Sequence, residues 1–213
     1  MIRGRGLSTA ATCCALVVCC VLVPGCSAGQ AGHGKRSSAA AAPGDCLPSP
    51  FASGPSSPFA SGPSTTPAAG AGAAVPDLAL PCFDGGRSVR LATLRGPVII
   101  NLWASWCAPC RTELPAVQRY AVAAAGRMSV LGVITRDSGR DAPASIIQGF
   151  GLTFPMLTDA NGALLAALGR TTLPVTLLVT GAGRIAYTYV GAALDEPALD
   201  GLARKYLGVE VPT

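Results

Sequence analysis

The chain has 213 residues, half of them hydrophobic, with a formal net charge of +5. This length suits one domain with accessory segments and is hardly enough for two domains. The positive charge is modest and forms no basic cluster interleaved with aromatic residues, which argues against a nucleic-acid-binding protein, so we expect no nucleic acid among its partners.

The first residues have the pattern of an export signal. Residues 1–9 carry Arg3 and Arg5 and no acid, and residues 10–23 form an apolar run broken only by Thr12. That run of about 14 residues is shorter than the roughly 20 that a membrane-spanning helix needs. A basic start followed by a short apolar core predicts a secretory signal peptide over residues 1–25.

The letters LVPGC over residues 22–26 resemble the lipobox of bacterial lipoproteins. The resemblance implies that Cys26 is lipidated and becomes the mature N-terminus. Two acyl chains on Cys26 would provide the stable anchoring that a single chain does not. Ordinary signal cleavage and an uncleaved anchor are the alternatives. In each case we expect the protein at the extracytoplasmic face of a bacterial membrane, or secreted.

Residues 26–75 are dominated by Ala, Gly, Ser and Pro, and residues 49–56 recur letter for letter as residues 57–64. Such a composition cannot bury enough apolar surface to offset its ordering entropy. We therefore predict a disordered tether that holds a domain, residues 76–213, away from the membrane. The only histidine, His33, lies in this tether.

From about Pro76 the pattern becomes that of a folded α/β domain. Alternation predicts a short strand over residues 88–91, and apolar runs predict buried strands over 97–103 and 128–134. Helical patterns span residues 107–125, 142–150, 161–168 and 196–207. Strands over 175–179 and 185–190 flank a glycine-rich turn. Strands alternating with helices indicate an α/β sheet, to which the last hairpin adds antiparallel strands.

Cys107 and Cys110 form a C-x-x-C pair that follows a predicted buried strand and opens a predicted helix. Backbone N–H groups at a helix start favour a thiolate over a thiol. We expect Cys107 to be the attacking sulfur and Cys110 the resolving sulfur of a thiol-disulfide exchange. The domain has no histidine and no second C-x-x-C pair, which disfavours a zinc site and a Cys-His hydrolase. We expect neither a metal nor a cofactor.

The letters NLWASWCAPCRTELP over residues 101–115 resemble the TlpA/ResA-type membrane-anchored thioredoxin-like family, close kin of the DsbE reductases. The resemblance covers about residues 76–207. It implies a thioredoxin-like fold, in which a central mixed sheet is flanked by helices and carries an N-terminal hairpin and a TlpA-type insertion near residues 141–157. Ordinary thioredoxins usually carry a buried Asp where this chain has Asn101, and the family implies that Glu113 exchanges protons instead. Alternatively, Glu113 is a first-turn acid that complements the helix dipole.

A second landmark of the family is TTLPVTL over residues 171–177. The resemblance implies that Pro174 is a cis-proline facing the active site and that the backbone of Leu173 pairs with the substrate. Trp106 would shape the surface beside Cys107. Leu173 and Val175 depart from the residues that the family often has there, and Pro174 could instead begin a strand in trans.

Cys46 and Cys82 remain outside these patterns. In an oxidising compartment two leftover cysteines predict a structural disulfide, which would close a loop of about 36 residues. A second redox pair that relays electrons to Cys107 and Cys110, or intermolecular or free thiols, are the alternatives.

The family resemblance implies an extracytoplasmic thiol-disulfide oxidoreductase that reduces disulfides in exported proteins, with cytochrome c maturation as one family use. A membrane electron donor of thiol-transferring type would recharge it. The alternatives are an oxidant that installs disulfides, a peroxiredoxin-like enzyme and a copper-binding chaperone. In the peroxiredoxin-like interpretation the peroxidatic Thr is replaced by Ala104, and a copper chaperone usually has a histidine beside its cysteines.

Overall fold

A computed structural model of the chain describes residues 46–47 and 72–211. The predicted signal peptide, the predicted lipidation site Cys26 and most of the predicted tether lie outside the described residues. Within the described ranges, none of the helices combines the length and the apolar character that crossing a membrane requires.

A five-stranded sheet forms the centre of the domain. Its strands are β3 (Val98–Trp103), β4 (Ser129–Thr135), β5 (Met156–Asp159), β6 (Val175–Val179) and β7 (Ile185–Val190), in the spatial order β5-β4-β3-β6-β7. β3 runs parallel to β4 and antiparallel to β6. All residues of β3 are buried because both faces of the sheet are covered, which explains the continuous apolar run.

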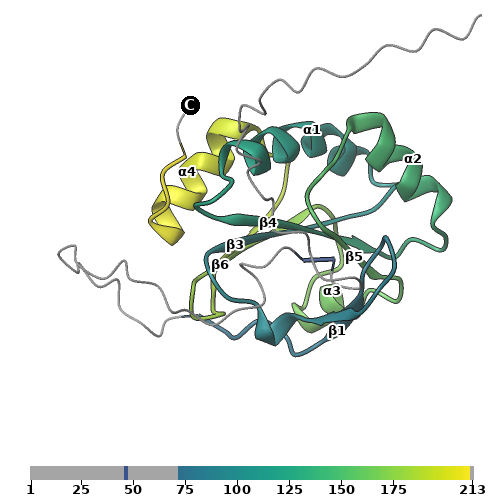
Figure 1. Ribbon diagram of the computed structural model, residues 1–213, viewed down its shortest axis with the longest axis horizontal. Helices are drawn as coiled ribbons and strands as arrows, with labels where there is room; N and C mark the ends of the chain where they lie inside the picture. Colours follow the sequence, from purple (N-terminus) through teal and green to yellow (C-terminus); the bar gives the residue numbers. More distant parts are fainter. Residues whose placement is uncertain (1–45, 48–71, 212–213) are drawn as a thin grey trace, which may run out of the picture. The chain divides into compact units, whose positions relative to one another are not determined.

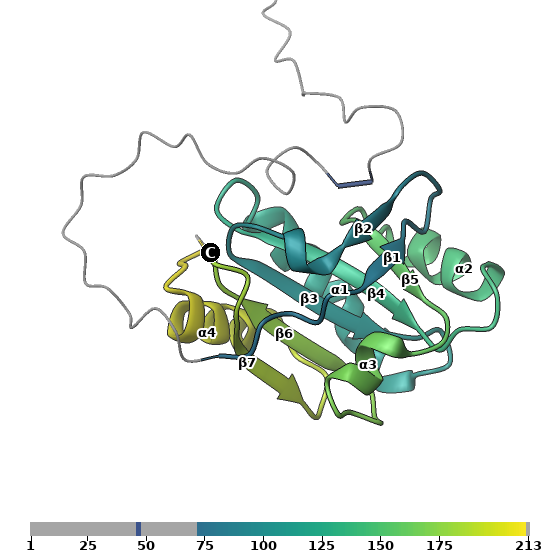
Figure 2. The same ribbon diagram turned by 90° about the horizontal axis from the view of Figure 1, so that it is seen from below.

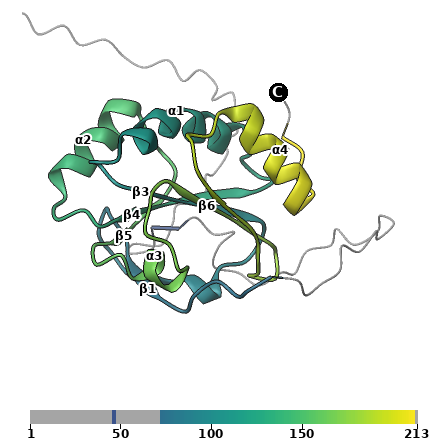
Figure 3. The same ribbon diagram turned by 180° about the vertical axis from the view of Figure 1, so that it is seen from behind.

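Helices cover the two faces of the sheet unequally. α1 (Ala108–Ala123), α2 (Asp141–Phe150) and α4 (Glu196–Leu207) lie on one face (Figures 1 and 3). α3 (Ala163–Ala167), the 3₁₀ helix η2 (Leu91–Thr93) and the hairpin of β1 (Ala79–Pro81) and β2 (Ser88–Arg90) lie on the other (Figure 2).

The side chains of β3 alternate between two separate cores. Ile99 and Trp103 belong to the core beneath α1, whereas Val98, Ile100 and Leu102 belong to the core on the opposite face. Asn101 therefore points toward α1, into the layer that also contains the two active-site cysteines.

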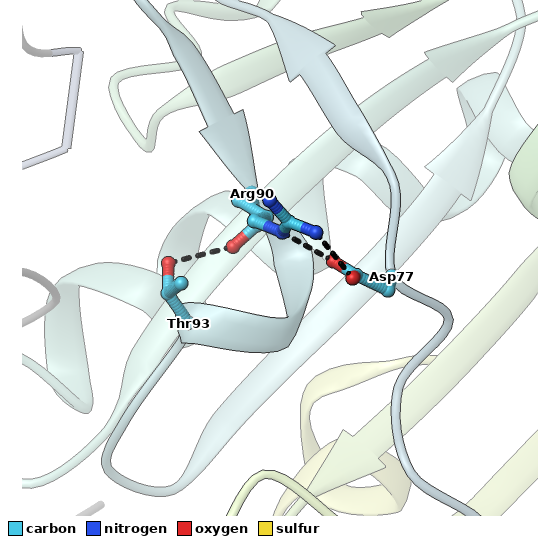
Figure 4. A network of polar contacts seen from close by, with 3 residues as sticks. All are labelled: Asp77, Arg90 and Thr93. Atoms are coloured by element: carbon cyan, nitrogen blue, oxygen red, sulfur yellow. Dashed lines mark hydrogen bonds and ion pairs between the residues drawn. The ribbon is translucent and has the colours of Figure 1, made fainter.

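The predicted thioredoxin-like fold, a central mixed sheet flanked by helices, is confirmed. The predicted N-terminal hairpin is β1–β2, and residues 141–157, which we predicted as an insertion, contain α2 and the first residues of β5. Arg90, at the end of β2, forms a bidentate ion pair with Asp77 and accepts a hydrogen bond from the Thr93 hydroxyl through its backbone oxygen (Figure 4). Because Arg90 and Asp77 are exposed, this pair fixes local geometry and contributes little to stability.

Ordered structure begins slightly before Pro76. The Ile185 N–H donates to Ala73 at 2.8 Å, and the Val75 N–H donates to Gly183 at 3.3 Å. Val75 is only 3% exposed, and Leu47 is also buried. These residues, which we predicted to belong to the tether, pack on the domain, because backbone pairing with β7 and a disulfide at Cys46 hold them there.

Candidate active site

Cys107 and Cys110 lie at the N-terminal end of α1, shortly after the end of β3. Cys107 is the N-cap of α1, with extended backbone angles, and a proline stands in the first turn, where its missing N–H costs nothing. The two sulfurs form a disulfide, 2.01 Å apart, so the structure describes the oxidised state. The C-x-x-C spacing thus closes a ring at the first turn of the helix.

The start of α1 provides a favourable setting for a thiolate at Cys107. The Cys110 N–H donates a hydrogen bond to the Cys107 sulfur at 3.3 Å, and the unpaired N–H groups of the first turn add their partial positive charge. Cys107 is 4% exposed and Cys110 is fully buried. Of the two residues only Cys107 has any exposed surface, which suits the predicted roles of attacking sulfur for Cys107 and resolving sulfur for Cys110.

Glu113 lies one turn beyond Cys110 and is 1% exposed. Its Oε1 accepts a hydrogen bond from the Asn101 amide at 2.7 Å, and its Oε2 accepts one from the Leu194 N–H at 3.1 Å. Burial raises the pKa of Glu113, and the two hydrogen bonds oppose that rise only in part. A carboxyl buried in this way is suited to holding and releasing a proton. The first turn of α1, where the alternative interpretation placed Glu113, contains no acidic residue.

The Leu173–Pro174 peptide bond is cis. Val175, the next residue, pairs with Leu102 in the antiparallel register of β6 with β3. Pro174 therefore lies at the edge of the sheet where β3 ends and α1 begins. Leu173 is half-buried and packs against the core that contains Cys107 and Cys110.

Residues 136 and 137, which directly follow β4, hold the loop before Cys107. The Asp137 carboxylate accepts hydrogen bonds from the Ser105 N–H at 2.7 Å and from the Ser105 hydroxyl at 2.5 Å. The indole N–H of Trp106 donates to the backbone oxygen of Arg136 at 3.0 Å. Trp106 is thus fixed at one edge while 59% of it stays exposed, forming an apolar surface beside Cys107.

Asp137 was not among the site residues predicted from the sequence. The signal was present, since β4 runs parallel to β3 and the carboxyl ends of neighbouring parallel strands meet at one edge of the sheet. A polar residue directly after each strand was therefore a candidate contact for the active-site loop. The hydrogen bond between Asn101 and Glu113 was also not anticipated.

Cys46 and Cys82 form a second disulfide, 36 positions apart in the sequence. Cys82 is buried in the core that faces α3, whereas Cys107 and Cys110 belong to the core beneath α1. The sheet separates the two disulfides, so the fold does not bring them together for direct exchange. Among residues 46–47 and 72–211, no group of three or more His, Cys, Asp or Glu side chains is placed to hold a metal ion.

Comparison with known proteins places this site in a family. Residues 71–188 match the model of the AhpC/TSA family. The thiol-disulfide oxidoreductase ResA of Geobacillus thermodenitrificans is 31% identical over 127 residues, which cover 59% of this chain and 72% of that protein.

Solved structures agree with this match. A putative thiol:disulfide interchange protein DsbE from Chlorobium tepidum superposes with a TM-score of 0.57 at 26% identity, covering 64% of this chain and 97% of that one. A secreted thiol-disulfide isomerase from Corynebacterium glutamicum superposes with a TM-score of 0.56 at 26% identity, covering 63% and 86%.

Proposed function

The chain belongs to the AhpC/TSA family and is a thiol-disulfide oxidoreductase, and we propose that it reduces disulfide bonds of exported proteins through Cys107 and Cys110. The observation that carries this proposal is the Cys107–Cys110 disulfide at the start of α1, with Pro174 and the start of β6 at the same end of the sheet. Cytochrome c maturation is one use to which such an activity can be put.

The reaction begins from the reduced pair. The Cys107 thiolate attacks one sulfur of the substrate disulfide, which forms a mixed disulfide and releases the other substrate sulfur as a thiolate. Glu113, as a carboxylate, then takes the proton of Cys110. The Cys110 thiolate attacks the Cys107 sulfur, which closes the Cys107–Cys110 disulfide and releases the second substrate thiolate. The substrate gains two electrons, and a thiol-transferring donor in the membrane must return two to the enzyme.

The surface around Cys107 supports binding of an extended substrate segment. In this proposal the backbone of Leu173 pairs with the segment beside the substrate cysteine, and the exposed face of Trp106 covers its apolar side. Because both contacts are with backbone or with a flat apolar surface, they allow substrates of varied sequence.

We also propose that the enzyme works outside the cytoplasm, tethered through a lipidated Cys26 after removal of residues 1–25, with the segment between Cys26 and the disulfide-bonded Cys46 as the spacer. The lipobox-like letters LVPGC support this location, as does the secreted relative from Corynebacterium glutamicum. Incorporation of labelled palmitate into the wild-type protein and its loss in Cys26→Ala test the anchor. Membrane association of Cys26→Ala equal to that of the wild type would overturn it.

The direction of electron flow is tested by the reduction potential of Cys107 and Cys110 in the full chain, equilibrated in defined thiol-disulfide buffers. Alkylation followed by peptide mass spectrometry reports this pair separately from the other cysteines. A value near that of thioredoxin, about −270 mV, supports a reductase. A value near −120 mV, as in strong oxidants, would make the protein an enzyme that installs disulfides.

Two further measurements separate the remaining alternatives. Consumption of hydrogen peroxide by the reduced protein would indicate a peroxiredoxin-like activity, which we do not expect because Ala104 replaces the peroxidatic Thr. Tight binding of copper(I) to the reduced protein, without catalysis of thiol-disulfide exchange, would indicate a copper chaperone.

A further inference from the structure

A buried polar cluster connects Glu113 to the central sheet. Asn101 on β3 lies opposite Thr176 on β6 in the antiparallel register, and both residues are buried. The Asn101 Nδ2 atom donates to Glu113 Oε1 at 2.7 Å and to Thr176 Oγ1 at 3.1 Å. Both hydrogens of one amide nitrogen are therefore used, and the two contacts together fix the plane of the amide.

The Asn101 amide is a polar group buried in an otherwise apolar strand. The other residues of β3 are apolar, and burying a polar group costs free energy unless it is hydrogen-bonded. The Asn101 Oδ1 atom is buried without a hydrogen-bond partner among the described residues. Only the nitrogen side of the amide is satisfied, and it is satisfied by Glu113 and Thr176. A buried group that is half unsatisfied calls for a specific explanation.

We propose that Asn101 is a positioning residue: its amide, braced by Thr176, holds the Glu113 carboxyl and sets the pH range over which that carboxyl exchanges a proton with Cys110. The link to catalysis rests on the proposed function. The effect of Asn101 on the titration of Glu113 does not depend on that function and can be measured separately.

Asn101 affects the titration of Glu113 because it interacts differently with the ionised and the neutral form of that carboxyl. A donor aimed at the carboxylate favours the ionised form, whereas burial favours the neutral form. When Glu113 is neutral, a reversed amide offers Oδ1 to the carboxyl O–H from nearly the same position, since the two ends of the amide are almost equal in size. Asn101 can therefore serve both states, whereas an aliphatic side chain would serve neither.

Other charges around Glu113 are few. Neither β3 nor β6 carries an ionisable side chain, and on α1 the titratable neighbour one turn away is Cys110. The charged groups of the packed helix α4 and its N-cap have partners of their own: Asp195 caps the helix, Glu196 pairs with Arg119, Asp200 pairs with Arg204, and Lys205 lies over the Tyr206 ring. The hydrogen bond from Asn101 is thus the main side-chain influence on Glu113 that a substitution can remove.

The test is a titration of the Glu113 side-chain carboxyl by carbon-13 NMR in the oxidised full chain. In Asn101→Leu we expect the midpoint to rise by roughly one pH unit, the size expected for a lost hydrogen bond to a charged group. Asn101→Asp keeps the size and polarity of the side chain, and its second carboxyl should raise the midpoint as well, because two adjacent carboxyls share one proton.

Thr135→Val is the matched control. Thr135 lies on the neighbouring strand β4 and donates a buried hydrogen bond to Asp159 at 2.9 Å. Its replacement removes one buried hydrogen bond to a carboxylate without touching Glu113. We expect the Glu113 midpoint to stay at the wild-type value in this variant, even if the protein becomes less stable.

The effect of Asn101 on catalysis is measured separately, from the pH dependence of the exchange rate. The pH profile of thiol-disulfide exchange should move upward in Asn101→Leu together with the NMR midpoint, and it should not move further when Asn101→Leu is added to Glu113→Gln. An unchanged Glu113 midpoint in Asn101→Leu would overturn the proposal. A shifted midpoint with an unshifted exchange profile would overturn its catalytic part. Absence of any exchange in the wild type would refute the proposed function and leave the NMR result standing.

Discussion

Removing the Cys46–Cys82 disulfide should destabilise the domain by a large and calculable amount. The bond joins residues 36 positions apart, and in the chain-entropy model a loop of that size lowers the free energy of folding by about 4 kcal/mol at 25 °C. The calculation multiplies 298 K by an entropy of about 13 cal/mol/K, obtained from 2.1 plus 1.5R times the natural logarithm of 36. That amount is a large share of the 5–15 kcal/mol that is typical of native proteins.

The assay is urea unfolding of the oxidised wild type and of the double variant Cys46→Ala/Cys82→Ala. Alanine avoids leaving a hydroxyl at the buried Cys82 position. The single variant Cys46→Ala should behave like the double variant if the bond itself provides the stability. A loss below about 1 kcal/mol would refute the chain-entropy reasoning for this loop.

Catalysis provides a second check on the same variant. Because the sheet lies between the two disulfides, thiol-disulfide exchange by Cys107 and Cys110 should continue at the wild-type rate at a temperature where the double variant is folded. A folded double variant that had lost exchange would show that Cys46 and Cys82 act as a relay.

Four further predictions, on three variants, concern the active site. In Glu113→Gln the rate of thiol-disulfide exchange should fall by roughly 100-fold near neutral pH, a typical effect of losing a general acid–base group, as measured by stopped-flow kinetics. The same variant should remove a pH dependence of stability: burial raises the pKa of Glu113, so its contribution is complete below the pKa of the unfolded chain and is lost as pH rises through the folded pKa. Urea unfolding from pH 4 to 8 should therefore show a decline in the wild type that is weaker in Glu113→Gln. Asp137→Ala leaves the Ser105 N–H and hydroxyl without their acceptor, and its free energy of unfolding should fall by about 2 kcal/mol, whereas an unchanged value would mean that water replaces the carboxylate. Trp106→Ala should change stability by less than about 0.5 kcal/mol, because the side chain is exposed, yet raise the KM for a protein substrate; an unchanged KM would remove Trp106 from the binding surface.

Much of the fold followed from local pattern. β3 is apolar except for Asn101 because it is buried on both faces, and Cys107 is the N-cap of α1, which has a proline in its first turn. The position of the C-x-x-C pair could therefore be predicted from the sequence. β1 did not follow from its own residues, because the letters ALP show no alternation of polar and apolar residues, and only the family resemblance implied the hairpin to which it belongs. The start of the domain was predicted a few residues late, because Val75 is held by backbone pairing with residues more than a hundred positions away.

Part of the active site could likewise be predicted from the sequence, and part depended on the tertiary structure. The sequence by itself determined that Cys107, Cys110 and Glu113 lie on one helix, because their spacing is short and the helical period relates them directly. Only the tertiary structure decided what surrounds Glu113, since Asn101 on β3 and the Leu194 N–H reach it from distant parts of the chain. The sheet register likewise decided that Asp137 holds the active-site loop and that the two disulfides lie in different cores. Helical periodicity relates residues that are close in the sequence, so it can be predicted from the sequence alone. Hydrogen bonds between separate elements depend on how the whole sheet is assembled.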